Sequence, residues 1–174
     1  YGMGGGVALR VSTDRAMGWP ARGLGAGTAY PRQPDEVSRN PKLAFLMLWH
    51  HAPTGTACLE AKYGMDLHGG AVNPPGYRGA FRRHPGGRGY TLEYAIPWAV
   101  LGAADDPPRA GDALAAMWLA HWGDPAGRTW KGQLIEVANP AEGGWNFDNA
   151  ATWGKAVYHP RGGLPADVAR PHAD

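Results

Sequence analysis

The chain has 174 residues, 18% of them charged, and a formal net charge of +2, which excludes a coiled coil and lacks the basic excess expected of a nucleic-acid partner. Its 27 glycines and 16 prolines lack the period of collagen, and eight tryptophans argue against a disordered tract. No apolar run of about 18 residues is present, so no membrane span is predicted, and the single cysteine, Cys58, excludes an internal disulfide.

Three segments in the first half of the chain are predicted to be strands. Val7, Leu9 and Val11 alternate with smaller or polar residues, which is the period of a half-buried strand. The apolar run 43–50 is short and is followed by proline and glycine, which favours a strand over a helix. The period of two appears again over 58–63.

Four more strands are predicted in the second half. The clearest is 90–96, where every second residue is large and apolar. Shorter apolar runs lie at 114–122, 133–137 and 153–158, each bounded by residues typical of turns.

The connections between these strands are rich in glycine and proline. Segment 97–101 is predicted to form one helical turn, because proline is favoured in a first helical turn and Gly102 follows as a stop. Segment 123–127, Gly-Asp-Pro-Ala-Gly, predicts a hairpin turn. Two longer stretches, 14–42 and 64–89, are interpreted as long loops, a kind of segment that often carries function.

Many short strands with almost no helix indicate an all-β fold, an antiparallel β-sandwich with long loops. We expect residues 1–160 to form one sandwich domain, and residues 161–174, rich in glycine and proline, to be a linker or tail. Since the chain begins without Met or a signal-peptide pattern, we expect it to be part of a longer protein.

The common enzyme motifs are missing. The sequence contains no GxSxG elbow, no HExxH helix and no GxxxxGK[ST] loop. A glycosidase needs only two carboxylates at the right separation, but Glu60 and Glu93 fall on the polar faces of predicted strands. We therefore expect no catalytic activity.

Tryptophan is the most informative residue type. Most of the tryptophans lie in or beside predicted strands and are expected to fill the core, Trp98 and Trp153 above all. Three others flank turns that also carry polar side chains, and a ring stacked on a sugar with polar groups around it makes a carbohydrate site. These candidate ligand residues are Trp122, Trp130, Trp145, Asp124, Arg128 and Asn146.

A haem group is an alternative ligand, because methionine, lysine and histidine side chains can hold haem noncovalently. Met65, Met117 and Lys131 are the candidate axial ligands. His50 and His51 are adjacent, so in a continuous strand their rings point to opposite faces and do not share one ion.

Two charged clusters are interpreted as solvated surface. Calcium would need six or more oxygens in one place, and an acidic loop is the simpler interpretation of Asp105, Asp106 and Asp112. An exposed hairpin is the simpler interpretation of the basic cluster, although it could also hold an anion. The basic cluster comprises Arg78, Arg82, Arg83, His84 and Arg88.

Several segments together resemble the family 9 carbohydrate-binding modules. The same superfamily contains DOMON domains and the haem-binding gamma subunits of ethylbenzene-dehydrogenase-type enzymes. The segment YTLEYAIPW at 90–98 and the closing WGKAVY at 153–158 carry most of the resemblance, with support from 6–11, 111–112 and 124–127. It extends over roughly residues 4–160.

The resemblance implies an immunoglobulin-like β-sandwich that binds a ligand rather than catalyses a reaction. Family 9 modules hold a terminal sugar between two tryptophan rings and often carry calcium, whereas the haem-binding relatives hold haem b by a methionine and a lysine. The 64–89 insertion departs from a minimal module.

We therefore expect a noncatalytic carbohydrate-binding module of a larger exported protein, extracellular or periplasmic, with other domains of the same polypeptide as its neighbours. The alternatives are a haem-binding electron-transfer domain and a structural or interaction sandwich without a small ligand.

Overall fold

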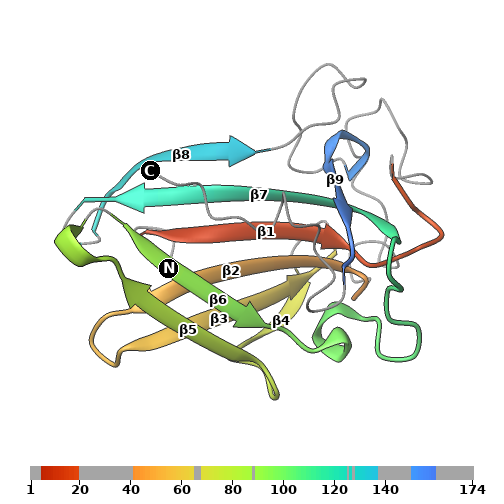
Figure 1. The fold of residues 1–174 in the computed structure, drawn as a ribbon, viewed down its shortest axis with the longest axis horizontal. Coiled ribbons are helices and arrows are strands. Elements are labelled where there is room, and N and C mark those ends of the chain that lie inside the picture. The colour runs from red at the N-terminus through yellow and green to blue at the C-terminus, as the bar shows by residue number, and fades with distance from the viewer. Residues whose placement is uncertain are drawn as a thin grey trace.

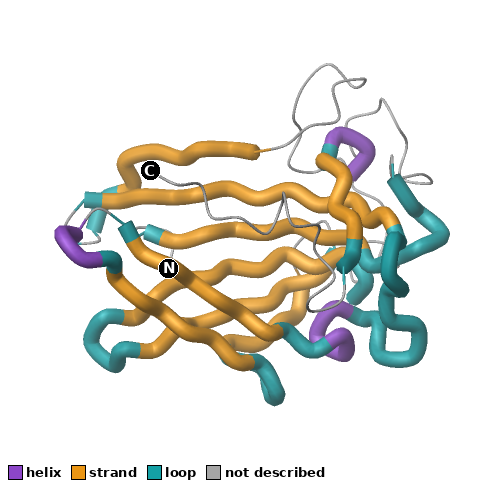
Figure 2. Tube along the Cα trace, in the orientation of Figure 1, coloured by secondary structure: helices purple, strands orange, loops and turns teal. Residues whose placement is uncertain are grey.

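The computed structural model describes residues 5–19, 41–64, 68–87, 89–124, 126, 128–136 and 150–159. Within these ranges the regular elements are strands and short 3₁₀ turns. The strands are β1 (Gly6–Ser12), β2 (Leu43–His51), β3 (Thr56–Tyr63), β4 (His68–Val72), β5 (Arg78–Arg83), β6 (Tyr90–Ala95), β7 (Ala113–Gly123), β8 (Trp130–Glu136) and β9 (Gly154–Val157). The turns are η1 (Pro85–Gly87), η2 (Trp98–Leu101) and η4 (Ala150–Thr152), which lie at the ends of the strands (Figure 2).

The strands form a large sheet and a two-stranded sheet, both antiparallel. The large sheet has the order β4-β3-β2-β1-β7-β8, and β9 pairs with the part of β7 that β8 leaves free. The hairpin β5–β6 makes the second sheet and crosses in front of the large one (Figure 1). The fold is therefore an all-β sandwich, as the strand periodicity predicted.

The hairpin packs on one face of the large sheet, which we call the hairpin face and which carries Leu46 and Leu59, both fully buried. The Tyr94 hydroxyl on β6 lies 3.1 Å from the carbonyl oxygen of Trp49 and 2.9 Å from that of Cys58. The Tyr77 hydroxyl donates to the Ala57 carbonyl oxygen at 3.2 Å. These hydrogen bonds hold the hairpin against β2 and β3.

The opposite face of the large sheet has its own core, built around Met117, Phe45 and Trp153. Arg10 is fully buried there. Its guanidinium lies 5.1 Å from the centroid of the Phe45 ring and 5.8 Å from that of Trp153. Its Nη1 atom donates to the Gly64 carbonyl oxygen at 3.3 Å. A buried cation is thus stabilised by two aromatic faces and a carbonyl.

All seven predicted strands are confirmed, with no boundary shifted by more than three residues. The predicted helical turn is confirmed as η2, and Gly102 ends it with a φ of 67°, which favours glycine. The turn between β7 and β8 is also where the sequence predicted it, and the Asp124 N–H donates to the Thr129 carbonyl oxygen at 2.9 Å across it.

The interpretation of 64–89 as a loop is wrong, because this segment contains β4 and β5. Two glycines in β4, and a glycine and three arginines in β5, leave neither strand with the apolar period that marks a strand in a sequence. Their pairing partners, β3 and β6, supply the hydrogen bonds that make them strands. In the other long predicted loop, 14–42, residues 20–40 lie outside the described ranges, as do residues 161–174.

None of the helical turns described in the structure has the length and apolar character needed to cross a membrane.

Candidate functional site

Two exposed tryptophans stand on the hairpin face of β7. Trp118 is 41% exposed and Trp122 is 48% exposed. Trp118 is the register partner of Leu9, whose side chain packs into the core of the hairpin face. Because side chains alternate along a strand, Trp118 and Trp122 share this face, whereas Met117 and Leu119 point into the core of the opposite face.

The ring of Trp122 lies over Gly132, its register partner on β8. A Cβ at position 132 would be 2.6 Å from Cζ2 of the ring and 2.9 Å from Cε2, closer than any real side chain could lie. The glycine therefore lets the indole rest on the backbone of β8 while about half of the residue stays exposed. This contact fixes where the ring is presented.

Two of the predicted polar neighbours of Trp122, Asp124 and Arg128, hydrogen-bond to each other within the turn between β7 and β8. Oδ1 of Asp124 accepts a hydrogen bond from the backbone N–H of Arg128 at 2.8 Å, which is a common way for aspartate to stabilise a turn. Arg128 itself is exposed. Trp130 begins β8 opposite Gly123. The predicted ligand residues Trp145 and Asn146 lie outside the described residues.

The candidate haem ligands do not come together in the described part of the chain. Met117 is 1% exposed and lies in the core of the opposite face, so a ligand at the surface does not reach its sulfur. Lys131 is exposed on β8, and Met65 lies outside the described residues. The adjacent histidines His50 and His51 make separate contacts. His50 stacks on Phe81 with 3.7 Å between ring centroids, and His51 Nδ1 lies 2.8 Å from Thr54 Oγ1.

The acidic cluster is held by an arginine. Arg15 forms ion pairs with Asp106 and, at 3.3 Å, with Asp112. Its hydrogen bond lowers the pKa of Asp106. The pKa of Asp112 is lowered first by a hydrogen bond from the backbone N–H of Arg109 and then by Arg15. Among the described residues no group of three or more His, Cys, Asp or Glu side chains could hold a metal ion.

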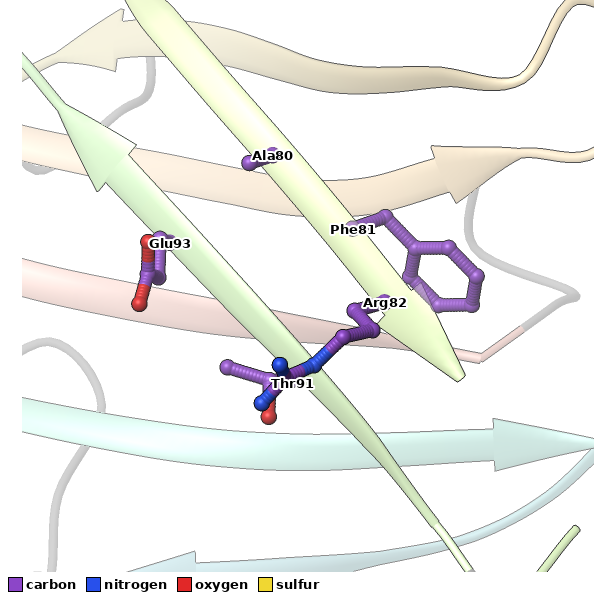
Figure 3. A pocket seen from close by; sticks show the side chains of 5 residues that line it. All are labelled: Ala80, Phe81, Arg82, Thr91 and Glu93. Carbon is purple, nitrogen blue, oxygen red and sulfur yellow. The ribbon is translucent and has the colours of Figure 1, made fainter. Parts of the chain in front are cut away.

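The outer side of the hairpin carries a hollow of about 250 Å³. Figure 3 shows the side chains of Arg82, Thr91 and Glu93 beside it, with Ala80 and Phe81. Arg82 and Thr91 are register partners across the hairpin, and Thr91 Oγ1 lies 2.9 Å from His84 Nε2. Three residues of the predicted basic cluster, Arg78, Arg82 and Arg83, are exposed side chains of β5.

The sequence pointed to Trp122 but not to Trp118 or Gly132. We expected most tryptophans in strands to fill the core, and Trp118 does not. Trp118 and Trp122 are four residues apart, so an unbroken strand places them on one face, and this spacing was the signal available in the sequence. The expectation of a buried ring is right for Trp153, which is fully buried, and Trp98 packs against the core of the hairpin face.

Comparisons with protein-family models, with curated proteins and with solved structures found no match for this chain.

Proposed function

We propose that this chain is a noncatalytic carbohydrate-binding module that takes its ligand on the exposed rings of Trp118 and Trp122. One observation carries the proposal. Two tryptophans on the same face of one strand are 41% and 48% exposed, although burying a large aromatic side chain is worth about 1.5–3 kcal/mol. Exposed apolar groups gathered in one place are typical of binding surfaces.

The chemistry of a sugar fits such a surface. One side of a pyranose ring presents C–H groups, which pack on the face of an indole, while the hydroxyl groups around its edge remain free for hydrogen bonds. Trp122 is already seated on Gly132, so it loses little conformational freedom when a ligand binds, and a preorganised ring binds more tightly.

The resemblance to family 9 modules supports the same ligand class. It extends the proposal to a module of a larger exported protein, extracellular or periplasmic, attached to other domains of the same polypeptide. In family 9 modules two tryptophan rings enclose a terminal sugar. The proposed surface differs from that arrangement, because Trp118 and Trp122 stand on the same face of one strand.

A panel of soluble glycans, titrated by isothermal calorimetry, tests the proposal. We expect binding by the native chain and a loss of roughly threefold to tenfold for Trp118→Ala and for Trp122→Ala, since a single aromatic contact is worth about 0.5–1.5 kcal/mol. Val157→Ala is the matched control, because Val157 is 41% exposed on β9 and should bind as the native chain does.

Two results would count against the proposal. The first is a folded native chain, shown by a cooperative thermal transition, that binds no glycan of a broad panel. The second is binding that survives replacement of both tryptophans.

A further inference from the structure

We infer that the surface formed by Trp118 and Trp122 binds an internal stretch of an extended polysaccharide, which lies along β7 with each ring on a different sugar. This inference rests on the proposed function and adds the form of the ligand: a chain held along its length, rather than a single sugar or a chain end.

The spacing of the two tryptophans carries the inference. They are four residues apart on β7, and a strand rises about 3.3 Å per residue, so their Cα atoms are separated by roughly 13 Å along the strand. A pyranose ring is similar in size to one six-membered aromatic ring. One sugar therefore covers one indole, and only a ligand several sugars long reaches both.

The residues between the two rings leave this line open. Ala120 is the residue of β7 that lies between Trp118 and Trp122 on the hairpin face, and its side chain is a single methyl group. On β1, Val7 is the register partner of Ala120 and Leu9 is the register partner of Trp118. Val7 and Leu9 are both half-buried. The described side chains of β1 and β7 on this face thus place nothing large between the rings.

The same side chains also carry no charge. On the hairpin face β1 contributes Val7, Leu9 and Val11, and β7 contributes only alanine, leucine and tryptophan. Along these two strands the contact with a ligand is made by stacking and apolar packing.

A series of oligosaccharides of increasing length tests the inference. The probes are β-1,4-linked gluco-, xylo- and manno-oligosaccharides from the monosaccharide to the hexasaccharide, with any further glycan found in the panel, each titrated by calorimetry. We expect affinity to rise with length until the ligand spans both rings and then to level off. Trp118→Ala and Trp122→Ala should each weaken the hexasaccharide roughly threefold to tenfold and abolish the gain over short ligands.

Chain ends are tested separately. Hexasaccharides with a reduced end, or with a blocked non-reducing end, should bind as the unmodified ligand does. Loss of binding on modifying an end, or a monosaccharide that binds as tightly as the hexasaccharide, would overturn the inference and leave the proposed function standing.

A second copy of the chain is the competing occupant of this surface. Sedimentation of the native chain and of the Trp118→Ala/Trp122→Ala double variant decides between them. A dimer that the double variant dissociates, together with no binding by any glycan, would overturn the proposed function and the inference alike. A native chain that sediments as a monomer and binds long glycans supports both.

Discussion

The indole of Trp122 occupies the space that a side chain at Gly132 would fill, with Cζ2 only 2.6 Å from the position of a Cβ. The contact joins β7 to β8 on the hairpin face and holds an exposed aromatic ring in place. A single glycine thus determines how the proposed ligand surface is presented.

Replacing Gly132 by alanine should therefore move the ring. We expect Gly132→Ala to cost about 1 kcal/mol of stability, because the added methyl forces the neighbouring group to shift, and to weaken glycan binding as much as Trp122→Ala does. Chemical unfolding and calorimetric titration measure the two effects. Gly5→Ala is the control, since a Cβ there meets only the His121 carbonyl oxygen at 3.6 Å. Binding unchanged in Gly132→Ala would contradict the role given to this contact.

Tyr94 fastens the hairpin to the large sheet. Tyr94→Phe removes the hydroxyl that lies near the Trp49 and Cys58 carbonyl oxygens, and we expect a loss of about 1 kcal/mol in urea unfolding. Tyr90→Phe is the control because Tyr90 is 49% exposed. Equal stability of the Tyr94 variant and the native chain would show that apolar packing alone holds the hairpin.

The same tyrosine makes stability depend on pH. Burial raises the pKa of Tyr94 above its ordinary value, and electrostatic interaction with Cys58 adds to the shift. A tyrosine of the unfolded chain ionises near pH 10, so the contribution of Tyr94 is fully present below pH 10 and is lost as pH rises toward the folded pKa. The free energy of unfolding, measured from pH 8 to pH 11, should fall less steeply with pH for Tyr94→Phe than for the native chain. Parallel decline in both chains would assign the alkaline sensitivity to other groups.

Arg15 lowers the pKa of two carboxyl groups, those of Asp106 and Asp112. Arg15→Gln should raise the pKa of Asp106 toward its ordinary value and that of Asp112 by less, because the backbone N–H of Arg109 still donates to Asp112. NMR titration of the carboxyl carbons measures both. Since the folded pKa values are lowered, their stabilisation is present above about pH 4 and is lost as pH falls. The native chain and the variant should therefore differ in stability at neutral pH and converge in acid. Equal shifts of the two carboxyl groups would contradict the different partners described for them.

Arg10 is expected to be the most sensitive charged position in the described core. Arg10→Ala removes a fully buried side chain from between Phe45 and Trp153, and we expect a loss of about 2–5 kcal/mol, as for other large-to-small changes in a core. Arg10→Met should lose less, because methionine fills much of the volume and packs well against aromatic rings. Urea unfolding compares the variants, with the exposed Arg128→Ala as control. A Met variant no more stable than the Ala variant would show that lost volume does not account for the effect.

The sequence was sufficient to predict the strands in which one face is apolar and the other is not. Val7, Leu9 and Val11 marked β1, and the alternation over 90–96 marked β6, because the period of two is a local property of the chain. It failed for β4, which contains two glycines, and for β5, which contains a glycine and three arginines. Both owe their strand conformation to hydrogen bonds, with β3 and β6 respectively. Those hydrogen bonds are contributed by partner strands, and pairing of this kind leaves little trace in the composition of a short segment.

The sequence by itself determined the fold class, most of the strands and the turn at 123–127, and it singled out Trp122 as a candidate ligand residue. Only the tertiary structure decided which side of β7 is exposed. This strand is apolar on both faces, so its pattern does not distinguish Met117 from Trp118. The hairpin is fastened to β2 and β3, which β1 separates from β7. On the opposite face Met117 shares a core with Met17 and Trp153. Burial depends on what packs against a side chain, and that is fixed by segments distant in the sequence.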